Sequence, residues 1–353
     1  MAPMDNNCSQ PQTWRFVVAG CGSIGRRHMK NLRALGAGKI FGCDLRADRR
    51  AEVNRELGIE TVASLDAAWG REPNAIVIAA PTALHMPLAI EAAERGVHLF
   101  VEKPLASSWD GVGRLMELAR QNNLVSLVGC NMRFHPGLIT VKRLLAEQGI
   151  GRIIAARVEA GHYLPDWHPW EDYRQTYSAR ADLGGGVILD AIHEIDYIRW
   201  LLGEVVGVFC LAGKLSRLEI DTEDTAAVLL RFENGALGEI HLDYIQRAYN
   251  RTCQIIGDEG TIHWDYIAGQ VRWYSAHTKT WQCFNNPMGW EANEMYLDEM
   301  RHFVNCLARR AQPEQDLFEA ARVLSIALAA KASALKPRWI ELETRSWNTN
   351  AIL

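Results

Sequence analysis

The stretch VVAGCGSIGRRHMKNL, residues 17–32, decides the fold of the first part of this chain. Gly20, Gly22 and Gly25 follow an apolar run, RFVVAG, whose β-branched residues are typical of a buried parallel strand. Apolar residues then recur at helical spacing up to a glycine-rich stop. The pattern predicts a strand, a glycine turn and a helix in immediate succession.

The next apolar run, KIFGCD, ends on Asp44 and completes the context that a dinucleotide-binding fingerprint requires. Asp44 is expected to bind the adenine ribose hydroxyls and to repel a 2′-phosphate, so NAD is expected in preference to NADP. Arg46 counts against this preference, because its side chain can turn toward a phosphate. The cofactor contacts expected at the glycine turn are Gly20, Gly22, Ser23, Ile24 and Gly25.

Composition excludes several classes of function. The chain has 353 residues, enough for two domains, with 48% hydrophobic residues, 23% charged residues and a formal net charge of −4. This charge gives no footprint for nucleic acid or an anionic membrane, and no apolar run reaches the length of a membrane span. Residues 1–13 are expected to be a disordered lead-in rather than a signal peptide. Eight scattered cysteines without a C-x-x-C pair favour a cytoplasmic protein.

The chain is expected to fold as two α/β parts. Strands and helices alternate over residues 14–130, which predicts a doubly wound parallel sheet. Residues 131–353 carry longer alternating strands and a hairpin turn at residues 234–235, which predict an α+β domain with a large, mostly antiparallel open sheet. Late helices near 291–310 and 316–335 are expected to pack back against the first domain.

Several motifs in order carry a resemblance to a known family. They are GCGSIGRRH, AAPTALH, VEKPLA, GCNMRFHPG and LGGGVILDAIHEID. Over residues 14–342 the chain resembles the glucose–fructose oxidoreductase/inositol dehydrogenase (Gfo/Idh/MocA) family. The resemblance implies an N-terminal Rossmann domain, a C-terminal α/β domain with a large antiparallel sheet, and NAD(P)-linked oxidation or reduction of sugars, cyclitols and related polyols.

Lys103 and His193 are the expected catalytic residues. Lys103 follows a predicted parallel strand, at the edge where open α/β sheets bind ligands, and can polarise a reacting oxygen. The resemblance implies that it is the catalytic lysine and that Glu102 lies on the cofactor side. His193 can exchange a proton near neutral pH, and Asp190 is three residues earlier on the same predicted helix. Solvated or packed structural roles remain the alternatives.

One departure from the family pattern bears on Asp190. Inositol-dehydrogenase-like members place the acid four positions before the histidine, where this chain has Leu189. Asp190 is therefore expected either to take a shifted version of the role of that acid or to cap a local network. The resemblance also implies cofactor contacts from Ala80, Pro81, Thr82, His85 and Asn131. Arg133 is expected to neutralise a carboxylate or phosphate, or to tie the domains together.

The stretch GHYLPDWHPWEDYR, residues 161–174, is the candidate substrate segment. Tyr163, Trp167 and Trp170 can stack on the apolar faces of a sugar, and together with Lys103, Arg133, Asp190 and His193 they form the expected substrate-binding set. The same segment can instead be a structural loop. Its histidines and Asp166 have no regular spacing for a metal, so no metal is expected.

Two classes of function remain on sequence grounds. One is an NAD-dependent sugar or cyclitol oxidoreductase, with a variant that oxidises a sugar transiently and eliminates a glycosidic group. The other is a non-catalytic dinucleotide-binding sensor or assembly protein, which would need neither Lys103 nor His193. An open sheet with one helical layer leaves an apolar face to cover, so a homodimer or homotetramer is expected.

Overall fold

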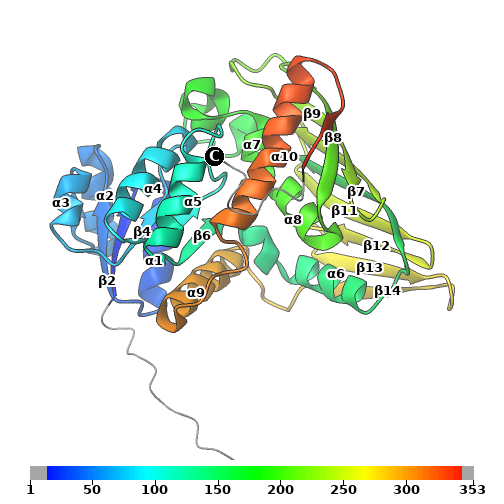
Figure 1. Cartoon of the computed structure of the whole chain (residues 1–353), viewed down its shortest axis with the longest axis horizontal. Coiled ribbons are helices and arrows are strands. Elements are labelled where there is room, and N and C mark those ends of the chain that lie inside the picture. The colour runs from blue at the N-terminus through cyan, green and yellow to red at the C-terminus, as the bar shows by residue number, and fades with distance from the viewer. Residues whose placement is uncertain (1–13, 344–353) are drawn as a thin grey trace, which may run out of the picture. The chain divides into compact units, whose positions relative to one another are not determined.

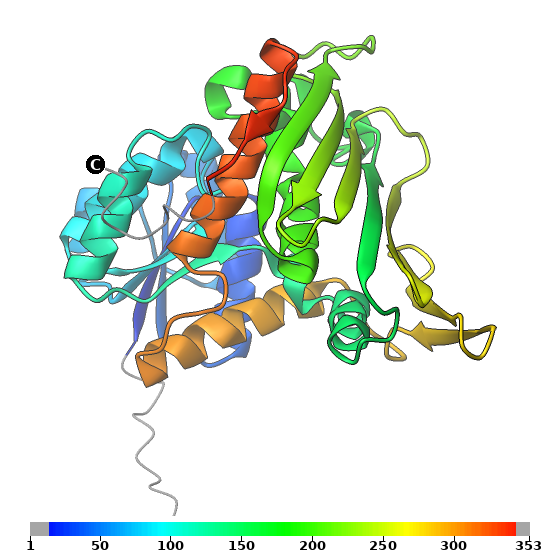
Figure 2. The same cartoon turned by 45° about the vertical axis from the view of Figure 1, so that its right-hand side comes forward.

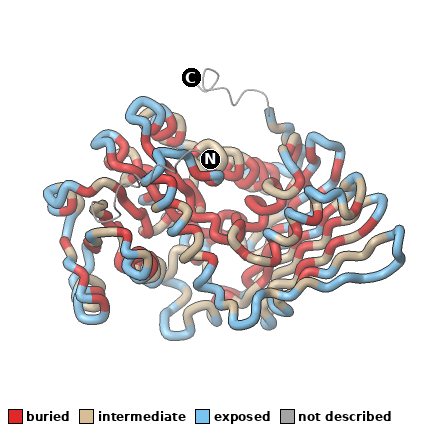
Figure 3. The backbone as a smooth tube through the Cα atoms, turned by 90° about the horizontal axis from the view of Figure 1, so that it is seen from below, coloured by how far each residue is buried: buried red, intermediate tan, exposed pale blue. Residues whose placement is uncertain are grey.

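The computed structural model describes residues 14–343, so the expected lead-in at residues 1–13 lies outside the described residues. Within them the chain divides into two compact units. The first comprises residues 14–105, 110–129 and 296–319, and the second comprises residues 106–109, 130–295 and 320–343. In Figure 3 the buried residues lie mainly in the inner parts of the tube, and the exposed residues lie mainly at its outer turns and along outlying stretches.

The first unit is a doubly wound parallel sheet of six strands (Figure 1). Its strands are β1 (Arg15–Ala19), β2 (Lys39–Cys43), β3 (Thr61–Val62), β4 (Ala75–Ile78), β5 (His98–Glu102) and β6 (Ser126–Gly129), in the order β3-β2-β1-β4-β5-β6. The helices are α1 (Ser23–Ala34), α2 (Ala47–Leu57), α3 (Leu65–Trp69), η2 (Thr82–Leu84), α4 (His85–Glu94) and α5 (Val112–Gln121). The parallel sheet predicted from residues 14–130 is confirmed.

The strands of this sheet are buried on both faces, because each face has its own layer of helices. Phe16 and Val18 lie in one cluster with Met29 of α1, and α4 packs on β4, β5 and α5. Helix α9 (Asn293–Arg309) joins the first cluster, where Phe303 meets Phe100 edge to face at a centroid distance of 5.6 Å. The first unit therefore includes a helix from late in the sequence.

Helix α10 (Leu317–Leu335) was expected to pack back against the first domain, but most of it belongs to the second unit. Only its first turn belongs to the first unit. Near its end, the Ser333 hydroxyl accepts a hydrogen bond of 2.9 Å from the backbone N–H of Cys210, within the second unit. A continuous helix thus carries the chain from one unit into the other.

The second unit is built on a sheet of nine strands (Figure 2). They are β7 (Ile153–Gly161), β8 (Val205–Gly213), β9 (Thr225–Phe232), β10 (Leu237–Asp243), β11 (Asn250–Gly257), β12 (Gly260–Asp265), β13 (Gln270–Ser275), β14 (Thr280–Asn285) and β15 (Ile340–Glu341), in the order β14-β13-β12-β11-β7-β10-β9-β8-β15. All neighbours are antiparallel except β7 and β10. The mostly antiparallel open sheet is confirmed.

Helices cover one face of this sheet. The α helices of this part are α6 (Pro136–Ala146), α7 (Val187–Asp190) and α8 (Ile192–Leu202), and the short helices between the strands and them are η3 (Asn131–Phe134), η4 (Leu164–Asp166), η5 (Tyr173–Gln175), η6 (Tyr177–Ala179) and η7 (Ala181–Leu183). Helices α6, α7 and α8 contact strands of the sheet, and the burial of β9 alternates residue by residue, as a sheet with one covered face requires.

The uncovered face is less apolar than the sequence led us to expect. Leu211 and Leu229 are about half exposed there, at 56% and 48%. The neighbouring strands instead carry an ion pair of 3.1 Å between Arg157 and Glu239, and His241 bonded to Asp243. Exposed Leu237 of β10 also lies on this face, so the uncovered face is partly apolar and partly charged.

Candidate functional site

The order of the first sheet reverses between β1 and β4, and this is where open α/β sheets bind ligands. Gly20 directly follows β1 and has a positive φ of 104°. A Cβ at Gly20 would overlap the carbonyl of Ala79, which directly follows β4. The two loops therefore meet at the switch point only because residue 20 lacks a side chain.

The other two glycines of the turn differ in whether the fold of the protein itself excludes a side chain at their positions. A Cβ at Gly25 would overlap the carbonyl oxygen of Gly20, so the chain itself excludes a side chain there. Gly22 has a φ of −71°, and a Cβ would meet only the guanidinium of Arg49, at 3.6 Å. A side chain at position 22 would therefore fit within the protein itself, and the space in front of Gly22 stays open.

The first turn of α1 suits a phosphate. No side chain caps its N-terminus, and no acidic residue lies in its first turn, which begins at Ser23 and Ile24. Backbone N–H groups at such a terminus attract anions. The open approach at Gly22 and this uncapped terminus together fit the pyrophosphate of a dinucleotide.

Asp44 fixes the end of β2 against the glycine turn. Its carboxylate accepts hydrogen bonds from the backbone N–H groups of Cys21, at 2.8 Å, and Arg46, at 2.9 Å. The side chain of Arg46 pairs with Asp48, with an Nη2–Oδ2 distance of 2.5 Å. The cation that sequence reasoning missed is Arg49, whose Nη1 lies 3.9 Å from the Asp44 carboxylate.

Lys103 follows β5 and is positioned through its backbone. Its N–H donates to Glu102 Oε2 at 3.2 Å, and Glu102 Oε1 lies 2.5 Å from Nε2 of His28. Burial raises the pKa of Glu102, whereas His28 and Lys103 lower it by more than burial raises it. The net pKa is therefore below the ordinary value, and the group is a carboxylate. His28 is fully buried and was missed; its position three residues after Gly25 was the available signal.

His85 joins two loops at this edge of the sheet. Its Nδ1 lies 2.8 Å from the carbonyl oxygen of Pro104, and its Nε2 lies 2.9 Å from that of Ala80. Burial lowers the pKa of His85, and the two carbonyl contacts oppose this effect. A neutral imidazole carries one N–H, so it donates to one of these two oxygens at a time. Pro81 and Thr82 lie between Ala80 and His85 in the loop after β4. The contact of His85 with Pro104 joins this loop to the loop that follows Lys103.

In the second unit, Asp190 and His193 do not lie on one continuous helix as predicted. Helix α7 ends at Asp190, and α8 begins at Ile192, because Ala191 has a ψ of 34° that breaks the helical hydrogen bonding. Both side chains are buried, with exposed fractions of 3% and 8%. The spacing argument for a shared helical face therefore does not apply.

The carboxylate of Asp190 accepts hydrogen bonds from side-chain hydroxyl groups. Oδ1 accepts from the hydroxyl of Tyr177, and Oδ2 accepts from Ser178 Oγ at 2.6 Å and from the hydroxyl of Tyr244 at 3.1 Å. None of these donors was predicted, because they are remote in sequence or lie in irregular segments. Their arrangement makes Asp190 the centre of a buried polar network.

Helix α8 is anchored on either side of His193. Arg133 donates to both oxygens of Asp196, at 2.9 and 2.6 Å, and Arg251 Nε lies 2.8 Å from Glu194 Oε1. Arg133 thus neutralises a carboxylate, as one alternative foresaw, but the carboxylate belongs to the same unit. Asn131, at the start of η3, is likewise buried.

The aromatic residues of the candidate substrate segment, residues 161–174, lie in different environments. Trp167 packs edge-on against Tyr244 at a centroid distance of 5.4 Å, and the guanidinium of Arg247 lies 3.6 Å above the ring of Tyr163. Trp170 is 73% exposed. Trp167 therefore contacts the network around Asp190 through the Tyr244 ring, and the backbone N–H of Leu164 donates to the Tyr244 carbonyl oxygen at 3.0 Å. Among the described residues, no group of three His, Cys, Asp or Glu side chains is arranged to hold a metal ion.

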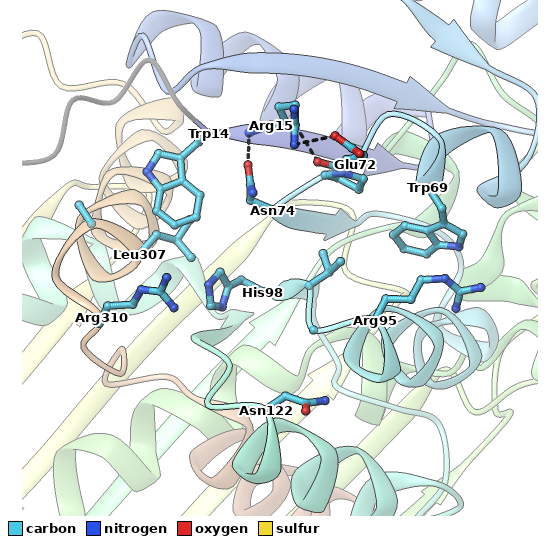
Figure 4. A pocket seen from close by; sticks show the side chains of 14 residues that line it. Trp14, Arg15, Trp69, Glu72, Asn74, Arg95, His98, Asn122, Leu307 and Arg310 are labelled. Atoms are coloured by element: carbon cyan, nitrogen blue, oxygen red, sulfur yellow. Dashed lines mark hydrogen bonds and ion pairs between the residues drawn. The ribbon is translucent and has the colours of Figure 1, made fainter.

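A cavity of about 720 Å³ lies at the opposite edge of the first sheet (Figure 4). It is lined by Arg15 and His98, the first residues of β1 and β5. Arg15 pairs with Glu72 at 3.3 Å, and Arg95 pairs with Glu91 at 3.2 Å at the C-terminal end of α4. Basic side chains there complement the carbonyl ends of helices, and we assign no ligand to the cavity.

Comparisons with known proteins identify the family. The model of the oxidoreductase family with an NAD-binding Rossmann fold matches residues 14–130, and that of the GFO/IDH/MocA C-terminal domain matches residues 138–263. The chain belongs to the GFO/IDH/MocA family of oxidoreductases. The predicted family, the enzyme class and the NAD-binding Rossmann domain are confirmed.

Relatives align over nearly the whole chain. Myo-inositol 2-dehydrogenase of Thermotoga maritima is 28% identical, over 93% of this chain and 98% of the relative. The NAD(+)-dependent scyllo-inositol 2-dehydrogenase of Bacillus subtilis is 26% identical, over 94% and 97%. A solved structure of levoglucosan dehydrogenase in complex with NADH has a TM-score of 0.85 at 22% identity, covering 94% of this chain and 99% of that chain. No helix among the described residues is long and apolar enough to cross a membrane.

The contrast between Gly22 and Gly25 gives a first prediction. Gly22→Ala should keep the thermal stability of the protein and weaken NAD binding, because its Cβ would enter only the space left for the pyrophosphate. Gly25→Ala should lower the melting temperature, because its Cβ would overlap the Gly20 carbonyl. Calorimetric NAD titration and thermal melts of both variants check this. Equal melting temperatures for the two variants would contradict it.

Proposed function

We propose that this protein is an NAD-dependent oxidoreductase that interconverts a hydroxyl group and a ketone on a sugar, a cyclitol or a sugar derivative. The observation that carries the proposal is Lys103 at the carboxyl end of β5, held by the buried Glu102–His28 pair beside a glycine turn that fits a dinucleotide. The family and the inositol dehydrogenases among its relatives support the substrate class.

The chain offers groups for both parts of the reaction. Bound NAD supplies the hydride acceptor or donor. We propose that the ammonium group of Lys103 polarises the reacting oxygen and that His193 exchanges the hydroxyl proton, with Asp190 supporting His193. Glycine-turn residues hold the phosphates, and Asp44 binds the adenine ribose.

The segment around Trp167 is proposed to bind the apolar face of the substrate. Its contact with Tyr244, which bonds Asp190, is the observation in its favour. A panel of sugars, cyclitols and sugar derivatives, followed by both reduced-nicotinamide absorbance and product mass, tests the proposal. Net NADH formation supports simple dehydrogenation. Product formation without net NADH would instead favour transient oxidation with elimination, and no reaction on any member would contradict the proposed activity.

Removal of either catalytic group should affect rate more than cofactor affinity. Lys103→Met should keep the fold and NAD binding but lose hydride transfer, and His193→Ala should lower single-turnover rates by about 10²–10⁴-fold. Asp190→Asn should cost less than His193→Ala and add little in the double variant, because residues that act as a unit are not additive. Lys30→Met and His277→Ala, at exposed positions, are the matched controls. Turnover of the Lys103 variant near the wild-type rate would refute the assignment.

Cofactor preference should depend on Asp44. We expect kcat/KM to be higher with NAD than with NADP, because the partly buried carboxylate of Asp44 repels the 2′-phosphate. Asp44→Ala should reduce the difference in kcat/KM between NAD and NADP. The Arg49 guanidinium lies within reach of the vacated position and can attract the 2′-phosphate. Steady-state kinetics with both cofactors measure this, with exposed Asp66→Ala as the control. Preference of the wild-type protein for NADP would overturn the role of Asp44.

We also propose that the protein assembles as a homodimer or homotetramer through the uncovered sheet face. Leu211, Leu229 and Leu237 form its apolar part, beside a groove of about 400 Å³ lined by charged residues of β7 and β10. Light scattering should show a mass of two or four 39.6 kDa subunits at micromolar concentration. Leu229→Arg should lower that mass, whereas Leu335→Arg, at a site 84% exposed on α10, should not. A wild-type mass of one subunit would reject the proposal.

A further inference from the structure

A set of hydroxyl groups from separate segments converges on Asp190. We name Tyr177, Ser178 and Tyr244 the hydroxyl clamp, because all three donate to the Asp190 carboxylate. Tyr177 and Ser178 belong to η6, and Tyr244 directly follows β10. Asp190 itself is 3% exposed, so these donors replace much of the hydration that the carboxylate would have in water.

We propose that the hydroxyl clamp holds Asp190 in its ionised form and fixes its orientation, so that its members are positioning residues for the acid–base step. The proposal rests on the proposed function, because it assigns the clamp to the reaction in which Asp190 supports His193. The proposal adds residues to the catalytic groups already proposed. The clamp residues act through Asp190 and are not proposed to touch the reacting atoms.

Hydrogen bonds to the charged form are what keep a buried carboxylate ionised. Burial alone favours the neutral acid, whereas two or three donors to the carboxylate oppose that effect. The donors must themselves stay protonated to act in this way. Burial and the charge of Asp190 raise the pKa of Tyr244 well above its ordinary value, so its hydroxyl remains a donor throughout the neutral range.

The three consecutive glycines before α7 make the clamp possible. A Cβ at Gly185 would overlap the carbonyl oxygen of Tyr177, and the N–H of Gly186 donates to the carbonyl oxygen of Ser178 at 3.2 Å. Gly186 has a positive φ of 108°. The backbone of η6 can therefore lie directly against the start of α7, which brings the hydroxyls of Tyr177 and Ser178 to Asp190.

Other charged groups lie near the network. Glu223 lies against Gly186, accepts a hydrogen bond of 3.3 Å from the N–H of Ile188, and has Lys331 of α10 at 3.5 Å. Its charge contributes to the raised pKa of Tyr244, as does Tyr177. His193, at the start of α8, is a titratable group close to Asp190 in sequence. Any pH dependence assigned to Asp190 must therefore be separated from that of Glu223 and His193.

The first experiment is the pH profile of kcat/KM for Tyr244→Phe and Ser178→Ala, each of which removes one donor. Loss of a hydrogen bond to a charged group should lower kcat/KM by roughly ten- to hundred-fold. Because the ionised acid loses support, it protonates at higher pH, so the acidic limb of the profile should move up by about one pH unit. Glu223→Gln reports the contribution of the neighbouring carboxylate, and Tyr274→Phe on β13 is the matched control. A lower rate with an unmoved acidic limb, or no change in either, would overturn the proposal.

A second measurement does not depend on activity. The carboxyl ¹³C signal of Asp190, assigned through its loss in Asp190→Asn, is titrated in the wild-type protein and in both clamp variants. A midpoint that moves to higher pH in the variants supports the clamp even if no polyol is oxidised, and an unchanged midpoint refutes it even if the enzyme is active. Near-UV circular dichroism verifies folding, and having two variants at different positions keeps the test decisive if one of them fails to fold.

Discussion

The close approach between α1 and β1 is the constraint on which the first unit depends. The α-carbon of Gly25 lies so near the carbonyl oxygen of Gly20 that no side chain fits between them. This contact brings the N-terminus of α1 to the edge of the sheet where the loops after β1 and β4 meet. The uncapped first turn, the open space at Gly22 and the anchored Asp44 all follow from that placement, because each lies within a few residues of it or is bonded to the turn.

The sequence predicted this region well because its contacts are mostly local. Strands β1 to β5 are each followed by a helix of the same unit, so hydrophobic periodicity alone gives the order of these elements. The late helix near 291–310 was expected to pack back against the first domain, and α9 does so. Sequence reasoning could not name the side chains that α9 packs against, because its buried residues resemble those of any amphipathic helix. Its position is decided by Phe303 packing against Phe100, two residues about 200 positions apart in the chain. The polar centre of the second sheet was missed for a similar reason: the Arg157–Glu239 pair exists only once β7 and β10 are neighbours.

The candidate site shows the same division between local and tertiary information. Lys103 and Glu102 could be predicted from a short motif, whereas the partner of Glu102, His28, is 74 residues away and becomes visible only in the folded unit. The break at Ala191 could not be foreseen either, because VILDAIHEID reads as one uninterrupted helix. In the structure Asp190 stands at the end of α7, where it receives donors from η6 and from the residue after β10. Tertiary hydrogen bonds have outweighed local helical preference.

Two buried carboxylates, one in each unit, are stabilised in different ways, and the difference bears on what each can do. Glu102 lies beside the basic side chain of His28 and accepts a backbone N–H, an arrangement suited to fixing the end of β5 and with it the backbone of Lys103. Asp190 is bonded by neutral hydroxyl groups, which support an ionised carboxylate without cancelling its charge. A charge stabilised by neutral donors in a buried site retains its effect on neighbouring titratable groups, because little solvent is present to screen it. Under the proposed function, the His193 imidazole gains and loses a proton and needs an anionic neighbour more than it needs another cation. This is the physical reason to expect hydroxyl donors rather than an arginine around Asp190, the acid proposed to support His193.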